Sequence, residues 1–274
     1  MKISSTSALV LNWTDMNLYQ GEKVKSFISN LDLSEGDSLM SALDADQHYM
    51  HTRAVSARKF YMSTNATLFL EQCEKENIEG QVLIMAAGIS PLSIALAERF
   101  PSASIFDLDL YLMEEKKEML KDEIPNVSFI KCDLDNIEFW STELIKNHFD
   151  SKKKTIAIFE GIVYYLKQDS LINIFKWCSS NNIEILGDYC IHPNQIDIHY
   201  QKYPDQVFSV IQKKLNLPPI VFYNKIEFTE LLTKSGYKDF EIEALPDIHL
   251  KRTGEINPFA IENSGWIAFW KCKI

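Results

Sequence analysis

Four short apolar runs in the middle of the chain are each followed by small or acidic residues. Gly88 follows the first run, Asp107 and Asp109 close the second, Asp133 follows the third and Glu160 follows the fourth. If these runs are parallel strands, their carboxyl ends lie along one edge of a sheet, which is where open α/β sheets bind ligands. Any one of these residues could instead cap a helix. Their coincidence at four successive strand ends indicates a ligand site.

The segment 81–109 has the form of a nucleotide-binding β-α-β unit. A buried run, a turn of small residues at 86–88, a helix and a second run ending in acids are the parts that hold an adenosine group. We expect Asp107, at the end of the second run, to accept hydrogen bonds from both ribose hydroxyls.

The turn after the first run is poor in glycine. A dinucleotide fingerprint would place glycines where this chain has Ala86, Ile89 and Pro91, so that the backbone can approach a pyrophosphate closely. A cofactor without phosphates demands less of the turn. This favours S-adenosylmethionine over a nicotinamide dinucleotide, with a tight turn of purely structural role as the alternative.

The other polar groups suit the same cofactor. Asp133 can accept from the adenine amino group, and Glu160 can lie close to the amino-acid end with its ammonium. The ligand carboxylate needs a cation, and the guanidinium of Arg58 offers two parallel donors in fixed geometry. The alternative for Arg58 is a surface position on an amphipathic helix.

From residue 81 onward, apolar runs of strand length alternate with helical stretches, which predicts an α/β fold with a parallel sheet covered by helices. The expected strands are 82–86, 104–108, 127–131, 155–160 and 183–188. The expected helices between and after them are 92–100, 114–121, 138–147, 170–179, 206–215 and 225–236.

Both ends of the chain depart from this alternation. Residues 1–75 have helical spacing and are expected to form a lid, leaving 76–274 as the core. The proline-containing segment 189–223 is expected to be an insertion that shapes the substrate site. Two closing strands at 237–243 and 265–271 could form a hairpin, and the long connection 245–263 is expected to be a functional loop.

Charge and composition exclude several classes of function. The chain has 274 residues, 28 basic against 38 acidic, so a nucleic-acid partner is disfavoured. Five scattered cysteines indicate neither a disulfide framework nor a zinc site, and no apolar run is long enough for a signal sequence or a membrane span. We expect a cytoplasmic protein without a membrane partner. His48 and His51 lack further ligands at metal spacing, so no metal is predicted.

The motifs above resemble those of the leucine carboxyl methyltransferase group of class I S-adenosylmethionine-dependent methyltransferases, which includes small-molecule O-methyltransferases of polyketide pathways. The resemblance begins near residue 45 and covers most of the chain. Its most specific part is Phe159-Glu160-Gly161-Ile162-Val163-Tyr164-Tyr165-Leu166. The other matching motifs are Ser56-Ala57-Arg58, 81–88, 106–109 with Lys116-Lys117, and Cys132-Asp133-Leu134.

This resemblance implies a seven-stranded, Rossmann-like methyltransferase fold with an N-terminal helical lid. It also implies the residues that bind S-adenosylmethionine and its product S-adenosylhomocysteine, and these agree with the roles assigned above. They are Arg58 at the methionine carboxylate, Ala86 and Gly88 beside it, Asp107 with Leu108 at the ribose, Asp133 with Leu134 at the adenine, and Glu160 at the amino-acid portion. The family turn reads Gly-Ala-Gly, an apolar residue, then Asp, so Ala86 and Ser90 are departures from it.

The acceptor side of the site is less defined by the sequence. A carboxylate acceptor needs no base, whereas a phenol or amine is helped by one, and Tyr165, Tyr189 and His192 are the candidates. Arg252 lies where the family's carboxylate-binding arginine would fall. A packed or solvent-facing role is the alternative for each of them.

The sequence therefore predicts an S-adenosylmethionine-dependent O-methyltransferase that acts on a carboxylate or hydroxyl of a small molecule, such as a secondary metabolite. A protein C-terminal carboxyl methyltransferase, a small-molecule N-methyltransferase and a non-catalytic S-adenosylmethionine-binding protein are alternatives. The pathway and the oligomeric state have no signal in the sequence.

Overall fold

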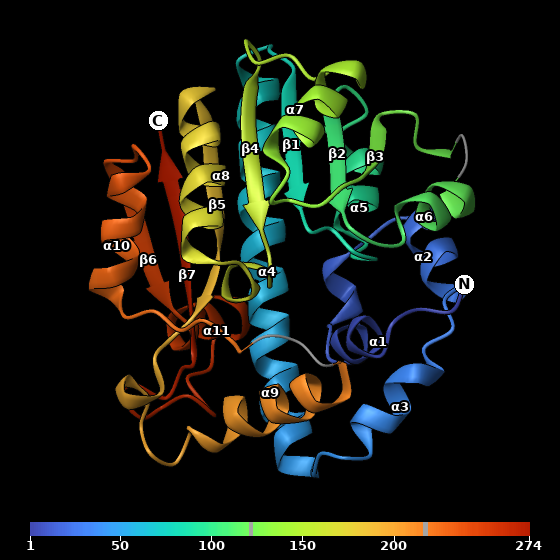
Figure 1. Ribbon diagram of the computed structural model, residues 1–274. Coiled ribbons are helices and arrows are strands. Elements are labelled where there is room, and N and C mark those ends of the chain that lie inside the picture. The colour runs from blue at the N-terminus through green and yellow to red at the C-terminus, as the bar shows by residue number, and fades with distance from the viewer. Residues whose placement is uncertain (121–122, 216–218) are drawn as a thin grey trace.

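A seven-stranded sheet forms the centre of the molecule (Figure 1). The computed structural model describes residues 1–120, 123–215 and 219–274. The strand order is β3-β2-β1-β4-β5-β7-β6; β1 to β5 pair in parallel, and β7 is antiparallel to both of its neighbours. The strands are β1 (Gly80–Met85), β2 (Ser104–Asp109), β3 (Val127–Lys131), β4 (Lys154–Phe159), β5 (Ile183–Cys190), β6 (Asp239–Ala244) and β7 (Ile267–Lys273).

The described part of the chain surrounds this sheet with helices. Those of the N-terminal region are α1 (Ser5–Asn12), α2 (Glu22–Ser29), α3 (Ser34–Met40) and α4 (Ala45–Lys75). Those between the parallel strands are α5 (Leu92–Arg99), α6 (Met113–Leu120), α7 (Ile137–Lys146) and α8 (Gln168–Ser180), and those after β5 are α9 (Lys202–Leu215), α10 (Lys225–Lys234) and α11 (Leu245–Thr253).

The predicted α/β alternation is confirmed, with strand and helix ends that differ by a few residues from the expected ones. The last residue of the expected helix 114–121 lies outside the described residues. The expected hairpin of closing strands exists as the β6–β7 pair, but β7 also pairs with β5. The connection 245–263 is not a loop throughout, because α11 occupies its first half; Pro246 stands in the first turn, where a missing N–H costs nothing.

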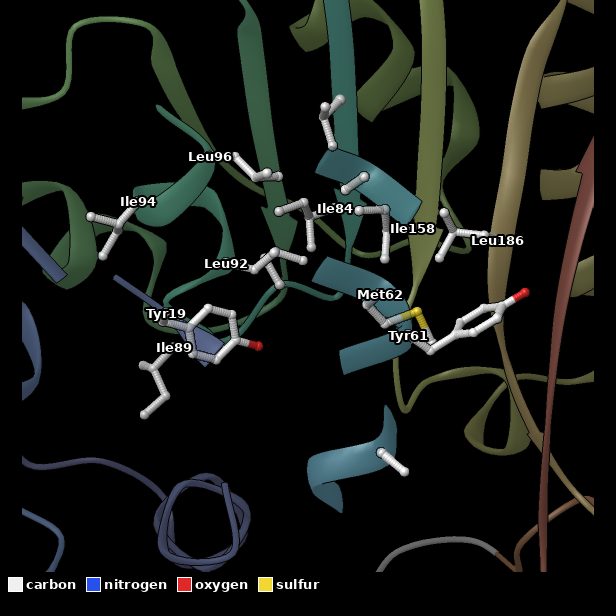
Figure 2. Close-up of a cluster of buried hydrophobic side chains, with 14 of the residues drawn as sticks. Tyr19, Tyr61, Met62, Ile84, Ile89, Leu92, Ile94, Leu96, Ile158 and Leu186 are labelled. Atoms are coloured by element: carbon white, nitrogen blue, oxygen red, sulfur yellow. The ribbon is translucent and has the colours of Figure 1, made fainter. Parts of the chain in front are cut away.

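Alternate residues of the central strands face two different apolar layers. Ile84, Ile158 and Leu186 are in register across β1, β4 and β5 and pack toward α4 and α5. Figure 2 shows these three beside Met62 of α4 and Leu92 of α5. Their strand neighbours face the opposite layer with α7, α8 and α10, and include Leu83, Ala157 and Phe159.

The 31-residue helix α4 is longer than the sheet that it covers. At about 1.5 Å per residue it spans roughly 46 Å, and its N-terminal half extends past the carboxyl edge of the parallel strands toward α9 (Figure 1). There Val55 packs with Leu9 and Trp13 of the α1 region and with Val207 and Ile211 of α9. The helices that precede α4 and the helix α9 thus meet over the sheet edge, where a lid was expected.

The cysteines and the helices also bear on the expectations from sequence. All five cysteines are buried free thiols. No helix among the described residues is both long enough and apolar enough to cross a membrane.

Candidate active site

A cavity of about 900 Å³ lies at the carboxyl edge of the parallel strands. Its floor is formed by the turn 86–90 after β1, Asp109 at the end of β2, and Glu160 with Gly161 after β4. Its roof consists of side chains from α1, α4 and α9. The roof residues include Trp13, His51, Val55, Val207, Phe208 and Ile211.

A buried ion cluster joins α4 to the end of β4. The carboxylate Oε1 of Glu160 lies 3.2 Å from Nε of Arg58 and 2.7 Å from Nζ of Lys59. Burial alone would raise the pKa of Glu160, but the two cations hold it below its ordinary value. Burial lowers the pKa of Lys59, partly offset by Glu160. The cluster therefore holds two cations against one carboxylate, at a place where all three side chains line the cavity.

Arg58 and Asp188 hold the residues around Glu160 in place. The Arg58 guanidinium donates from Nη1 to the Tyr164 hydroxyl at 3.3 Å. The carboxylate of Asp188 accepts from the Gly161 N–H at 2.8 Å, and burial raises the pKa of Asp188 to about 6. Gly161 has a φ of 68°, and a Cβ there would lie 3.4 Å from Arg58 Nη1. The left-handed backbone therefore favours glycine at 161, whereas a Cβ there would make only an ordinary van der Waals contact with the guanidinium.

The turn after β1 adopts left-handed backbone at two positions. Ala86 has a φ of 61° and Gly88 a φ of 50°. The Gly88 N–H donates to Oδ2 of Asp109 at 2.8 Å, while the Tyr111 N–H donates to Oδ1 of the same carboxylate at 2.8 Å. Ala86 keeps the conformation that glycine would adopt freely, which costs roughly 1–2 kcal/mol for an L-residue. Burial raises the pKa of Asp109, which lines the cavity.

Asp107 does not lie where the sequence analysis placed it. Its side chain is fully buried beneath the turn, with Oδ2 accepting from Ser93 Oγ at 2.6 Å and paired with Lys116 Nζ at 2.7 Å. Because β2 continues to Asp109 in register with Lys131 of β3, the acid that reaches the cavity is Asp109.

Lys116 connects this buried pair to the turn. Besides Asp107, its Nζ donates to the carbonyl oxygens of Ser90 at 2.8 Å and Gly88 at 3.4 Å. Its side chain is fully buried, so each donor hydrogen bond replaces a lost contact with water. Asp107 and Lys116 thus act on the turn from below and hold its carbonyls in position.

The expected adenine residues lie outside the cavity. Leu108 and Leu134 are buried in the apolar layer, and Asp133 is exposed and accepts from the Asp135 N–H. They follow or end neighbouring strands as predicted, but they do not line the cavity.

The expected acceptor-side residues separate from one another. Tyr165 lines the cavity, whereas Tyr189 stacks on Phe228 in the core and His192 is exposed. Arg252 belongs to α11 and pairs with Asp15 at 2.5 Å rather than facing the cavity. No cluster of three metal-ligating side chains occurs among the described residues.

Several residues that the fold brings to the site have no clear signal in the sequence. Lys59 follows Arg58 directly, but no spacing signals that both cations would reach one carboxylate. Asp188 lies inside β5 rather than at its end, so its position in the sequence did not indicate a site residue. Trp13 and His51 are 38 residues apart in sequence. Both line the cavity only because the lid packs across it.

The fold is an α/β fold of the class I methyltransferase type. Two features define it: the strand order, in which the antiparallel β7 lies between β5 and β6, and the acid at the end of β2. A family model described as leucine carboxyl methyltransferase matches residues 15–179. This match covers more than half of the chain, so the protein belongs to the leucine carboxyl methyltransferase family, whose members are S-adenosylmethionine-dependent methyltransferases. No curated protein sequence matches the chain.

Solved structures share the fold at low sequence identity. A DUF574 family protein from Streptomyces avermitilis is 13% identical with a TM-score of 0.61, over 97% of this chain and 96% of that one. A putative methyltransferase from Thermobifida fusca is 12% identical with a TM-score of 0.58, over 92% and 93%. A putative O-methyltransferase from Nostoc punctiforme is 12% identical with a TM-score of 0.47, and the match covers 81% of this chain and 60% of that longer chain.

The family match ends at residue 179, before β5, α9 and β7. The matched part contributes the turn, Asp109, Arg58 and Glu160, which form the charged end of the cavity. The roof from α9 and the wall at Trp266 lie beyond the matched residues.

Replacing Lys116 with methionine is expected to lower the free energy of unfolding by about 3–5 kcal/mol, because Asp107 would be left as an unpaired buried charge. Chemical denaturation measures this change. The exposed neighbour is the control, since Lys117→Met should change stability by less than about 0.5 kcal/mol. The Asp107→Asn, Lys116→Met double variant should recover part of the loss. Equal effects of the two single lysine substitutions would contradict the ion-pair assignment.

Replacing Ala86 with glycine is expected to raise the free energy of unfolding by about 1 kcal/mol, because glycine relieves the left-handed strain. The matched control is Ala87→Gly, at a buried residue without positive φ, which should lower stability by about 1 kcal/mol. Urea unfolding of the three proteins measures both changes. A loss of stability in Ala86→Gly as large as that in Ala87→Gly would show that the turn carries no such strain.

Proposed function

We propose that this protein binds S-adenosylmethionine at the charged end of the cavity and transfers its methyl group to an oxygen of a small apolar molecule at the other end. The observation that carries the proposal is the division of one cavity into two chemically different ends. Glu160, Arg58, Lys59 and Asp109 lie at one end, and most side chains at the other end are apolar or aromatic, with Ser4, Thr6 and Ser7 as polar exceptions.

The charged end has the donors and acceptors that an adenosyl amino acid requires. Asp109 can accept from the ribose hydroxyls, since a carboxylate has about four lone-pair sites and backbone N–H groups use two of them. Arg58 and Lys59 offer cations to the ligand carboxylate, and Glu160 offers a carboxylate to its ammonium. A cavity of about 900 Å³ is within the usual range for small-molecule sites.

S-adenosylmethionine supplies an electrophilic methyl group on a sulfonium sulfur. The protein's own contribution is to align the acceptor oxygen with that methyl and to exclude water. In such a transfer the acceptor oxygen would gain the methyl, and the electron pair of the broken C–S bond would stay on sulfur to give the thioether. A hydroxyl acceptor would also release its proton to bulk solvent.

The apolar end supports a small-molecule acceptor. Trp13, Val55, Val207, Phe208 and Ile211 come from three separate helices and together close over the cavity. Such walls bind ring-bearing apolar molecules through buried area, at about 25 cal/mol per Å². They are less suited to the polar backbone of a protein C-terminus, whose N–H and C=O groups would need partners there. A protein that only bound the cofactor would have no need of these apolar walls, so they favour an enzyme with an acceptor over a non-catalytic S-adenosylmethionine-binding protein.

The first test is calorimetric titration of the protein with S-adenosylhomocysteine. We expect Asp109→Asn to weaken binding about ten- to a hundredfold, because the ribose hydroxyls lose a charged acceptor worth about 1.5–3 kcal/mol. The control is Asp133→Asn at the next strand end, which is exposed and outside the cavity and should leave the affinity unchanged. Circular dichroism checks that each variant is folded.

Two results would count against the proposal. A folded wild-type protein that binds neither S-adenosylmethionine nor S-adenosylhomocysteine would remove the cofactor. Weaker binding in Asp133→Asn with unchanged binding in Asp109→Asn would restore the adenine contact expected from the sequence and move the pocket away from the cavity described above.

A further inference from the structure

One face of α4 runs along the whole cavity. His51, Ala54, Val55 and Arg58 follow at helical spacings of three, one and three residues, and all four line the cavity. Arg58 marks the cofactor end because it pairs with Glu160. His51 lies seven residues earlier, about two turns or roughly 10 Å along the helix. It is therefore placed at the acceptor end.

Two oxygen atoms fix the tautomer of the His51 ring. Nε2 lies 3.1 Å from Oε1 of Gln47 and 3.2 Å from the carbonyl oxygen of Tyr203. A carbonyl oxygen accepts and never donates, so Nε2 carries the proton. The amide orientation of Gln47 agrees, because its Nε2 donates to the carbonyl oxygen of Lys202 at 3.2 Å. In a neutral ring the other nitrogen, Nδ1, is then a hydrogen-bond acceptor.

The ring is neutral at physiological pH and rigidly held. The pKa of His51 is lowered to about 4, chiefly by burial and also by the nearby His48 and Arg58, against the opposing effect of the Tyr203 carbonyl. The ring stacks on Trp13 at 4.8 Å between centroids and meets the edge of Trp266 at 5.4 Å. Among the described residues, Nδ1 of His51 has no hydrogen-bond partner. The cavity thus contains a fixed acceptor among aromatic walls.

We propose that His51 Nδ1 accepts the hydrogen bond of the acceptor's hydroxyl group, so that the substrate is a neutral, aromatic-type alcohol rather than a carboxylate. This inference rests on the proposed methyltransferase function and narrows it. A neutral hydroxyl has the donor that Nδ1 lacks. A carboxylate has only lone pairs, and it would face the lone pair of Nδ1 in a site that has desolvated it.

Two of the residues that contact His51 come from outside the segment that matches the family, whereas Gln47 lies inside it. Tyr203 begins α9, and Trp266 precedes β7, both after residue 179. The lid helix α9 therefore both closes the cavity and selects the tautomer. This makes the selectivity for a hydroxyl a property of how α9 packs on α4.

The test uses the protein saturated with S-adenosylhomocysteine and two probes of the same shape, 2-naphthol and 2-naphthoate. By calorimetry we expect 2-naphthol to bind at least tenfold more tightly than 2-naphthoate. His51→Phe keeps a ring against Trp13 and should abolish this preference. His48→Phe is the matched control. The Nδ1 atom of His48 accepts a 3.2 Å hydrogen bond from Nε1 of Trp13, but His48 does not line the cavity, so the preference should remain.

A second measurement needs no substitution. Long-range ¹⁵N–¹H correlation spectra report the protonation of each nitrogen in the protein's six histidines, and His51→Phe identifies the signals of His51. We expect a proton on Nε2 in the free protein and a shift of the Nδ1 resonance when 2-naphthol binds, with no such shift for 2-naphthoate.

The possible results distinguish failure of the proposed methyltransferase function from failure of the role of His51 alone. Failure of S-adenosylhomocysteine to bind overturns the proposed function and this inference together. If S-adenosylhomocysteine binds, equal or tighter binding of 2-naphthoate, absence of 2-naphthol binding, or an unchanged Nδ1 resonance overturns the role of His51 alone. Loss of the preference in His48→Phe as well as in His51→Phe would assign the effect to lid packing and also overturn it.

Discussion

The buried pairing of Glu160 with Arg58 and Lys59 is the interaction on which the site depends. Two cations and one carboxylate are removed from water at the end of β4, and each cation is tolerated only because the Glu160 carboxylate lies within about 3 Å of it. This requirement fixes α4 over the sheet edge at one rotation and one height. The positions of His51 at the far end of α4 and of the roof above it follow from that placement. The charged cluster thus determines where the other residues of the cavity lie, and it is also a candidate ligand site.

The turn after β1 shows how a departure from a family pattern is accommodated. Ala86 retains a left-handed conformation although it carries a Cβ, and Ser90 replaces an acid. The compensation comes from beneath, where Lys116 ties two carbonyls of the turn to the buried Asp107. The backbone N–H groups stay directed upward, where Gly88 bonds Asp109. The shape of the turn therefore depends on a side-chain network instead of on glycines.

The parts of this architecture that depend on local pattern were predictable from the sequence. Strand-length apolar runs predicted β1 to β5, and the residues at the ends of β1 and β4 line the cavity as their positions suggested. Asp107 and Asp109 could not be told apart in this way, because both follow the same apolar run on the same face of β2. Which one reaches the cavity depends on how far the ladder with β3 extends. The role of His51 was equally hidden, because its partners at Gln47 and Tyr203 come together only when α9 packs on α4.

The place of β7 in the sheet has a consequence for how the chain acquires its structure during synthesis. β7 lies between β5 and β6, and β6 pairs with no other strand in the described sheet (Figure 1). The parallel strands β1 to β5 can associate as soon as they leave the ribosome, but β6 must wait unpaired until residues 267–273 have emerged. During that interval the edge of β5 and the apolar surface that Trp270 will cover are open to other chains. Arrival of β7 closes both at once, so β7 completes the described sheet and protects it from aggregation.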